Sequence, residues 1–172
     1  MTAMNLGRYT VSGSDDVTVF LIGMRVRKPW RVDQWVPVAR AFTRMLAYLE
    51  RTPEAGLLGH EEWFGRTTLM LSYWRSPEHL QRFAADPDAP HAEPWRIFMR
   101  SVGADPVVGV WHETYRATPG NYEVVYLDMP DFGLGKAVGV QRVGAGSSTA
   151  RQRLRRAGRL DTTPKRSEAT QS

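Results

Sequence analysis

Residues 67–102 read TTLMLSYWRSPEHLQRFAADPDAPHAEPWRIFMRSV and pass from a strand pattern into two helical patterns. The β-branched and aromatic content of residues 67–74 favours a paired strand. Ser76 and Pro77 then supply a helix N-cap and a proline suited to the first helical position. The stretch therefore predicts a strand that is followed directly by a short helix over 77–85.

A second helix is expected from His91 to Val102, after Pro87 and Pro90 have interrupted the first one. Its inward face, at helical spacing, comprises His91, Trp95, Phe98 and Val102. The imidazole thus points the same way as the aromatic side chains. Because burying a polar group costs free energy unless it is paired, the surroundings of His91 are expected to be unusual.

Two elements are expected before this stretch. Residues 17–26, VTVFLIGMRV, are apolar on both alternating faces, which predicts a central strand covered on at least one side. An apolar stripe at helical spacing runs over residues 33–51. Asp33 is the expected N-cap of this helix, and Pro37 is expected in the first turn, where proline does least harm.

Two more strands complete the pattern. Residues 57–64 are expected to pair with residues 67–74 as a hairpin or a bent antiparallel pair, and residues 107–116 alternate into a last strand. The resulting order is βαββαβ, the split arrangement of ferredoxin-like domains. We therefore predict an α+β fold over residues 15–116, in which helices cover one face of an antiparallel sheet.

The other face of this sheet is expected to need a partner. Strands such as VTVFLIGM (17–24) and TTLMLSYW (67–74) carry large residues on both sides. An exposed apolar surface of that size normally marks an interface, and packing against a second copy is the simplest way to cover it. We therefore predict a homodimer in which two sheets pack face to face.

The composition is that of an ordinary soluble domain. The chain has 172 residues, of which 42% are hydrophobic and 24% charged, and it has no cysteine. It therefore has no disulfide, thiolate metal site or cysteine nucleophile. No apolar run approaches the roughly 18 residues of a membrane span, and the N-terminal MTAMNLGRYT lacks the apolar core of a signal peptide. A cytoplasmic protein without a membrane partner is expected.

Positive charge is concentrated near the C-terminus. Residues 1–135 hold 14 Lys/Arg and 16 Asp/Glu, whereas residues 136–172 hold nine and two. Residues 144–172 contain few large apolar side chains, which predicts a disordered basic tail. Nucleic acid is not an expected partner, because no aromatic residues are interleaved with the arginines. Residues 117–143 are expected to form an ordered C-terminal arm between the domain and the tail.

Within residues 15–137, five segments carry a family resemblance: FLIGMRVRKPWRVDQWVPV, GHEEWFGRTTLMLSYWRSPEHLQRFA, HAEPWRIF, VVGVWHETYRATPGNYEVVYLDMP and FGLGKA. They resemble a family grouped with small antibiotic-biosynthesis-type monooxygenases of the dimeric α+β barrel superfamily. The resemblance implies a dimeric α+β barrel with a pocket between the sheet and the helices of each subunit. The superfamily includes cofactor-free oxygenases, haem-degrading enzymes, haem aldoxime dehydratases and non-enzymatic members, so the fold is better specified than the activity.

Two histidines are candidates for chemistry. His91 is placed to act as an acid or base on a bound phenol or enol, or to ligate haem iron, unless it is a hydrogen-bonded core residue. His112 shares one strand face with Val110 and Thr114, while Trp111 lies on the other face. The pattern leaves open which of these faces meets the helices.

Arg66 and several apolar residues complete the candidate site. Arg66 can hold a carboxylate or enolate oxygen with its guanidinium fork, or pair with Glu61 or Glu62. The substrate-binding candidates are Trp74, Trp95, Trp111, Phe98 and Met24, which either converge on an aromatic pocket or form plain core. No set of two histidines and one carboxylate stands out, so no protein-held metal is expected.

Three functions fit these residues. The first is a cofactor-independent monooxygenase for an aromatic or polyketide-like substrate, with His91 as base and Arg66 or His112 as oxyanion donor. The second is a haem protein, such as a haem-dependent dehydratase or oxygenase, with His91 as axial ligand. The third is a non-catalytic dimeric binding module, which a tightly packed interior without a cavity would favour.

Overall fold

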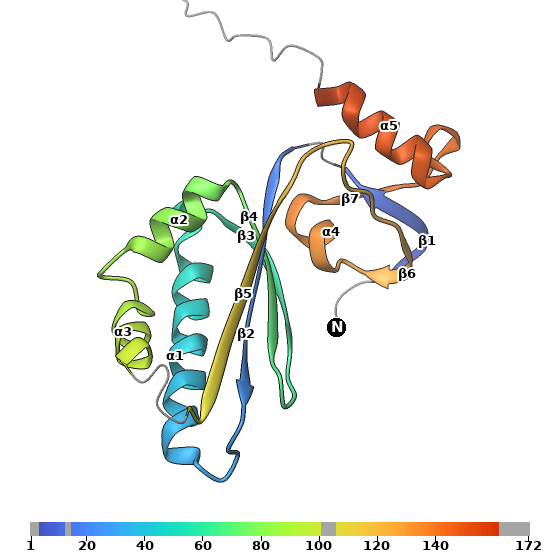
Figure 1. Ribbon diagram of the computed structural model, residues 1–172. Coiled ribbons are helices and arrows are strands. Elements are labelled where there is room, and N and C mark those ends of the chain that lie inside the picture. The colour runs from blue at the N-terminus through green and yellow to red at the C-terminus, as the bar shows by residue number, and fades with distance from the viewer. Residues whose placement is uncertain (1–3, 13–14, 101–105, 162–172) are drawn as a thin grey trace, which may run out of the picture. The chain divides into compact units, whose positions relative to one another are not determined.

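The computed structural model describes residues 4–12, 15–100 and 106–161 of the chain (Figure 1). The chain divides into two compact units, one of residues 17–116 and one that combines residues 1–16 with 117–172. No helix among the described residues is long and apolar enough to cross a membrane.

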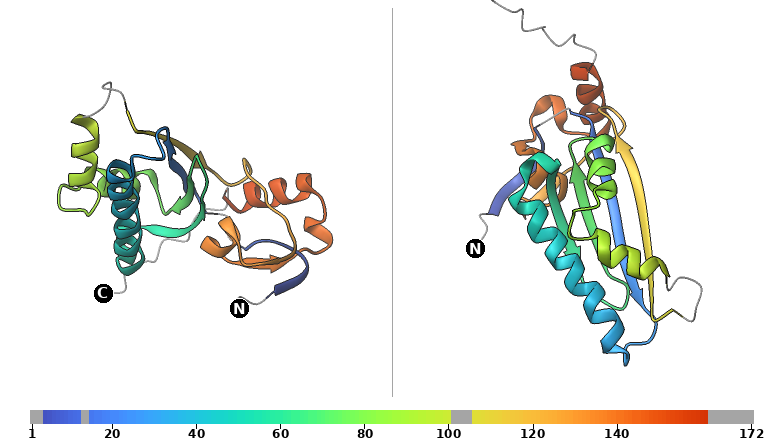
Figure 2. Two further views of the ribbon diagram at one scale, coloured as in Figure 1. Left: turned by 90° about the horizontal axis from the view of Figure 1, so that it is seen from below. Right: turned by 90° about the vertical axis from the view of Figure 1, so that its left-hand side faces the viewer.

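The unit of residues 17–116 is built on a four-stranded sheet in the order β3-β4-β2-β5. Its strands are β2 (Val17–Val26), β3 (Leu57–Trp63), β4 (Leu69–Trp74) and β5 (Val108–Ala117). Its helices are α1 (Val32–Arg51), η1 (Pro53–Ala55), α2 (Pro77–Ala85) and α3 (Ala92–Arg100). Strand β4 pairs antiparallel with both β2 and β3, and α1, α2 and α3 lie on one face of the sheet (Figure 2). The predicted α+β, ferredoxin-like fold is confirmed.

Helix α2 starts as its sequence predicts. Pro77 is its first residue, and the Ser76 hydroxyl accepts a hydrogen bond from the His79 N–H at 3.4 Å. The cap satisfies one of the backbone donors that a helix start leaves unpaired. Helix α3 begins at Ala92, one residue after His91, whose carbonyl oxygen accepts the Trp95 N–H at 2.9 Å. The expected end of this helix at Val102 lies outside the described residues.

Helix α1 starts differently from the prediction. Its N-cap is Arg31, and the assignment of Asp33 as the N-cap is wrong, because Asp33 lies in the first turn. The Asp33 carboxylate accepts hydrogen bonds from the Arg31 guanidinium at 3.0 and 3.1 Å, and this contact lowers the pKa of Asp33. Pro37 lies inside the helix rather than in the first turn. The Asp33 carboxylate therefore binds the side chain of the N-cap residue and does not cap the helix.

The core of this unit lies between the sheet and its helices. Its buried residues are Met45, Leu46 and Leu49 of α1, Met70 and Trp74 of β4, Leu80 and Phe83 of α2, and Ala89. Trp74 is 1% exposed, and its ring lies 5.5 Å from that of Phe83. Each large apolar side chain buried in this way stabilises the fold by about 1.5–3 kcal/mol. These contacts hold α1 and α2 on the sheet.

The second unit has a three-stranded sheet in the order β6-β1-β7. Its elements are β1 (Met4–Val11), β6 (Tyr126–Pro130), α4 (Gly133–Val138), β7 (Val140–Arg142), η2 (Ala145–Ser147) and α5 (Ala150–Asp161). The expected arm of residues 117–143 thus contains two strands and a helix, and β1 from the N-terminal end of the chain joins its sheet. The sequence pattern did not predict β1.

The expectation of disorder from residue 144 differs from the structure, which has η2 and α5 in residues 145–161. Residues 162–172 lie outside the described part of the chain. Arg153 of α5 is buried, donates to the Glu123 carboxylate at 2.6 Å and donates to the Ser147 carbonyl at 3.0 Å. Composition does not distinguish a buried arginine that has an acidic partner from a solvated arginine. The high arginine content therefore led to a prediction of disorder where α5 is found.

Gly23 in β2 generates a prediction for stability. A Cβ at this position would lie 2.7 Å from Trp111 Nε1 and still closer to the Thr68 carbonyl oxygen. Because the oxygen belongs to the backbone, it cannot move aside without disturbing the sheet. We expect Gly23→Ala to lower the free energy of unfolding by about 1–3 kcal/mol in urea denaturation.

Gly109 in β5 supplies the matched control, because a Cβ there would meet nothing within 4 Å. We expect Gly109→Ala to change the free energy of unfolding by no more than about 0.5 kcal/mol. Equal destabilisation by the two alanine variants would contradict the packing described for Gly23.

Candidate functional site

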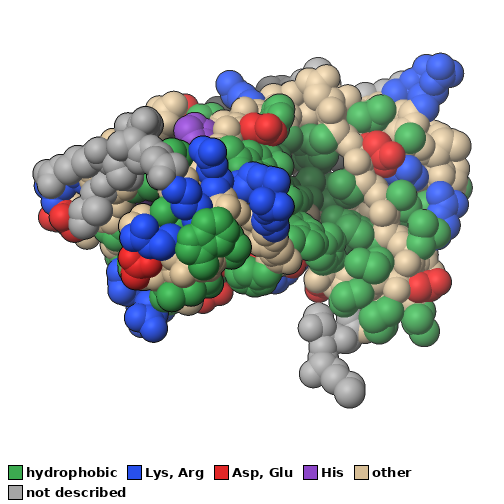
Figure 3. Space-filling view, turned by 60° about the horizontal axis from the view of Figure 1, so that its bottom comes forward, with side chains coloured by type: hydrophobic (Ala, Val, Ile, Leu, Met, Phe, Trp, Pro, Cys, Tyr) green, Lys and Arg blue, Asp and Glu red, His purple; other side chains and the backbone are tan. Residues whose placement is uncertain are grey.

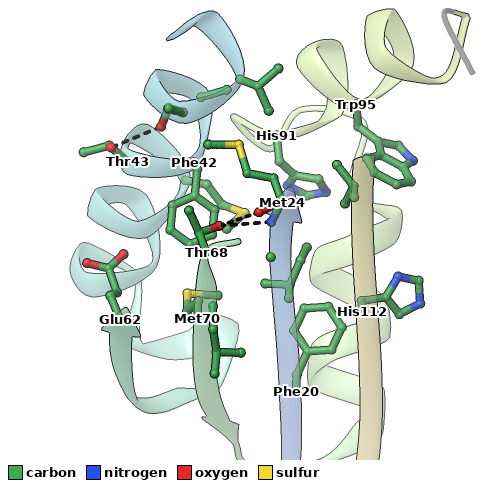
Figure 4. Close-up of a pocket in the computed structure, with 18 of the residues that line it drawn as sticks. Phe20, Met24, Phe42, Thr43, Glu62, Thr68, Met70, His91, Trp95 and His112 are labelled. Carbon is green, nitrogen blue, oxygen red and sulfur yellow. Dashed lines mark hydrogen bonds between the residues drawn. The ribbon is translucent and has the colours of Figure 1, made fainter. Parts of the chain in front are cut away.

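A cavity of about 800 Å³ lies in the unit of residues 17–116 (Figure 4). Its walls come from β2, β4 and β5, from the hairpin that joins β3 to β4, and from α1, α2 and α3. The lining is mostly apolar and includes Phe20, Ile22, Phe42, Met45, Met70 and Phe98. An apolar cavity with a few polar groups is the usual form of a small-molecule site.

The strands present alternate residues to this cavity. Strand β2 contributes the side chains of Phe20, Ile22, Met24 and Val26, and β5 contributes Val110, His112 and Thr114. Val110, His112 and Thr114 therefore form the face of β5 that meets the helices, which settles the alternative that the sequence left open.

Trp111 lies on the opposite side of β5 and is not among the described lining residues. Its Nε1 lies 2.7 Å from the position that a Cβ on Gly23 would occupy, so its indole covers the backbone of β2. The expectation that Trp111 joins an aromatic pocket therefore differs from the structure, because adjacent residues of a strand point to opposite faces.

His91 stands between α2 and α3 and lines the cavity. Its Nε2 lies 3.3 Å from the Ala84 carbonyl oxygen, and its ring centroid lies 4.6 Å from that of Phe83. Because a carbonyl only accepts, Nε2 must carry the hydrogen, and Nδ1 is then the basic nitrogen. Nδ1 is enclosed and has no hydrogen-bond partner among the described residues.

Two hydroxyl groups of the lining are already satisfied. The Thr68 hydroxyl accepts from the Met24 N–H at 3.0 Å and donates to the Met24 carbonyl at 3.4 Å. The Thr43 hydroxyl donates to the Ala39 carbonyl at 3.2 Å, one turn earlier in α1. Hydroxyl groups that bond the backbone in this way are poorly available to a ligand. His91 is therefore the more available hydrogen-bonding group.

Arg66 and His112 lie at exposed positions of the lining. Arg66 is in the turn between β3 and β4, and its side chain is exposed. The ring of His112 packs at 5.8 Å from that of Phe20 (Figure 4). Both side chains can therefore turn toward a ligand that enters from solvent.

The remaining predicted substrate contacts divide between core and cavity wall. Trp74 is fully enclosed, and its Nε1 donates to the Ser72 hydroxyl at 3.0 Å, so it forms part of the floor. Trp95 is 43% exposed, and its ring lies 5.6 Å from that of Phe98. With Met24, these residues line the same cavity. Trp95 and Phe98 thus form a partly exposed aromatic part of the cavity wall, whereas Trp74 is buried.

Sequence reasoning missed two groups of lining residues. One is the inward stripe of α1, which includes Trp35, Val38, Ala39 and Phe42 and was recognised only as helix core. The other is Glu62, which was considered only as a partner for Arg66. The pairing of Glu62 with Met70 places its side chain on the cavity face of β3. That register could not be read from the sequence.

Comparison with known proteins places the chain among monooxygenase-like sequences. A family described as monooxygenase af470-like matches residues 17–134. Monooxygenase af470 of Aspergillus fumigatus is 30% identical over 135 residues, which span 72% of this chain and 47% of that protein. The chain thus spans about half the length of this curated relative.

Solved structures share the fold. An aldoxime dehydratase in complex with butyraldoxime has a TM-score of 0.62 at 14% identity, over 77% of this chain and 39% of that one. SnoaB, a cofactor-independent oxygenase from Streptomyces nogalater, has a TM-score of 0.41 at 20% identity, over 60% of this chain and 93% of that one. The first of these likenesses supports the fold alone, and the second is too slight to support an argument.

The contacts of His91 generate a prediction for its tautomer. We expect long-range ¹H–¹⁵N spectra to show hydrogen on Nε2 and an unprotonated Nδ1, because Nε2 bonds the Ala84 carbonyl. The exposed His112, for which the structure describes no hydrogen bond, is the control and should show rapid exchange between tautomers. Hydrogen on Nδ1 of His91 would contradict the geometry described here.

Proposed function

The chain belongs to the monooxygenase af470-like family, and on this basis we propose that it is a small monooxygenase acting on an aromatic or polyketide-like substrate. The observation that carries the proposal is the enclosed Nδ1 of His91, a basic nitrogen without a protein partner at the wall of an apolar cavity. An unsatisfied buried acceptor costs about 1–3 kcal/mol, which a ligand hydroxyl would recover.

In the proposed reaction, Nδ1 of His91 accepts the proton of a phenol or enol that lies against Phe20, Phe98 and Trp95. The O–H bond breaks, an N–H bond forms, and the electron-rich anion of the substrate transfers an electron to dioxygen. One oxygen atom ends in the product as a carbonyl, and the other leaves as water with the hydrogen of the oxidised carbon and the proton that His91 returns. Exclusion of water by the apolar wall protects the intermediates from protonation.

Arg66 and His112 are the proposed donors to the oxyanion. Both line the cavity from exposed positions, so neither needs to break a described bond within the protein to reach a ligand. Arg66 offers two parallel N–H donors to an enolate or carboxylate oxygen, and its positive charge favours the ionised form of the substrate.

Haem is a poorer match for His91. Its Nε2, the ring nitrogen farther from the backbone, is bound to the Ala84 carbonyl, and its Nδ1 is enclosed. Iron on Nδ1 would bring a porphyrin against the histidine's own backbone and the start of α3. A ring nitrogen so close to the backbone leaves less room for a porphyrin than for a phenol or enol oxygen, so we propose chemistry without haem.

A non-catalytic module was the third possibility, and a tightly packed interior would have favoured it. The interior instead contains a cavity of about 800 Å³, so it is not tightly packed throughout. This volume lies within the usual range for small-molecule sites and is large enough for a polycyclic aromatic compound.

We further propose that the protein is a homodimer. Leu71 of β4 pairs with Leu21 and Glu61, on the face of the sheet opposite Met70 and the helices. The side chains of Leu21 and Leu71 remain partly exposed. Other apolar side chains are also exposed at the molecular surface, next to Lys and Arg side chains (Figure 3). A second copy packed on the Leu71 face would bury the sheet on both sides.

Substitution of His91 tests the proposed reaction. We expect His91→Gln to lower the rate of oxygen uptake by about 10²–10⁴-fold with a reactive phenolic or quinol substrate, because glutamine cannot take the proton. The measurement is oxygen consumption with a panel of such substrates.

His79→Gln is the matched control, because His79 packs near Gly56 and is not among the described lining residues. We expect its rate to stay within about threefold of the wild type. Unchanged uptake in His91→Gln would overturn the proposal, and a Soret band that forms with added hemin only when His91 is present would favour haem binding instead.

A charged substitution on the Leu71 face of the sheet tests the proposed homodimer. We expect the wild type to sediment as a dimer and Leu71→Asp to sediment as a folded monomer, because a buried unpaired carboxylate opposes association. Val32→Asp at the exposed start of α1 is the control and should remain dimeric. A monomeric wild type would show that association does not cover this face.

A further inference from the structure

Glu62 places a negative charge on the wall of the apolar cavity. In the ladder between β3 and β4, Glu62 lies opposite Met70 and its neighbour Glu61 lies opposite Leu71. Met70 belongs to the buried core beneath the helices, whereas Leu71 belongs to the other face. Glu62 lines the cavity and Glu61 does not appear among the described lining residues. Two adjacent carboxylates thus occupy opposite faces of one strand.

The Glu62 carboxylate has no partner within the part of the chain that the structure describes. The side chain is half-buried, and no hydrogen bond or ion pair joins it to a described residue. Arg66 lines the same cavity but does not pair with it. Figure 4 shows Glu62 on the α1 side of the cavity, with His112 on the far side and His91 between them. Glu62 therefore contributes a negative charge to the wall of the cavity.

Glu62 is also the only acidic residue among the described lining residues. A carboxylate beside an apolar cavity loses part of its hydration, and a cation within the cavity would compensate for that loss. The partly enclosed position also reduces screening by salt and solvent, compared with the exposed Arg66. The same charge would repel a carboxylate placed at this end of the cavity.

We propose that Glu62 determines substrate class and selects ligands in which an ammonium group is attached to the aromatic body. The aromatic body lies on the apolar wall, and the ammonium group donates hydrogen bonds to the Glu62 carboxylate. This inference rests on the proposed function only in placing the substrate in the same cavity. It needs neither oxygen chemistry nor a base at His91.

Three probes of similar shape test the inference: 1-naphthylmethylamine is cationic at pH 7, 1-naphthalenemethanol is neutral and 1-naphthoate is anionic. Binding to the full-length protein is measured by isothermal titration calorimetry. We expect the amine to bind about tenfold more tightly than the alcohol, because its ammonium group donates charge-assisted hydrogen bonds to the Glu62 carboxylate, and the naphthoate to bind most weakly. In Glu62→Gln, the amine and the alcohol should bind equally.

Glu61→Gln is the matched control, because it removes the same charge from the same strand on the other face. It should retain the preference of the wild type for the amine, and thermal unfolding verifies that both variants are folded. A preference for the amine that persists in Glu62→Gln, equal binding of amine and alcohol by the wild type, or binding of no probe would each overturn the inference. Oxygen uptake by the wild type and His91→Gln is measured separately, so failure of the proposed reaction is distinguishable from failure of this one.

Discussion

The pairing of β2 with β4 determines which side chains the cavity contains. Because successive residues of a strand point to opposite faces, the alignment of Ile22 with Met70 places every second residue of both strands beneath the helices. The ladder to β3 extends the same alternation to Glu62. A shift of the register of β4 by one residue would turn Met70 and Trp74 to the other face of the sheet, and the cavity would lose its floor.

Gly23 shows that side chains pack closely on the face of the sheet opposite the helices. The absence of a side chain at Gly23 lets the Trp111 indole lie over β2, close to the Thr68 carbonyl. Trp111 is thereby directed away from the cavity, and His112 next to it is directed toward the cavity. The two adjacent aromatic side chains of β5 have separate roles, one in packing against the sheet and one at the edge of the candidate site.

The polar groups of the cavity differ in whether the protein already uses them. The Thr43 and Thr68 hydroxyls bond the backbone, and the Trp74 indole bonds the Ser72 hydroxyl. His91 uses one nitrogen and leaves the other without a described partner. Beside an apolar wall, such a nitrogen and a carboxylate without a described partner interact more strongly with a ligand than they would in water, because the local dielectric is lower. His91 and Glu62 would therefore both favour ligands that carry hydrogen-bond donors, such as a hydroxyl or an ammonium group.

The sequence alone determined the order of strands and helices in residues 17–116, the cap of α2, and the presence of a histidine beside aromatic residues. These features follow from local rules: alternation in strands, helical periodicity, and the turn chemistry of Ser76 and Pro77. The resemblance of its segments to a monooxygenase-type family was also visible there, and the match of residues 17–134 confirms it.

Only the tertiary structure decided which face of β5 meets the helices, which nitrogen of His91 is basic, and that Glu62 belongs to the cavity. It also decided that β1 pairs with β6, and that residues 150–161 form a helix, α5, in which Arg153 is buried. Each of these depends on a contact between separate segments, such as β3 with β4 at Glu62 and Met70, or α5 with residues 117–125 at Arg153 and Glu123. Local propensity carries no information about such contacts, because strand register and buried ion pairs arise only when separate segments pack together.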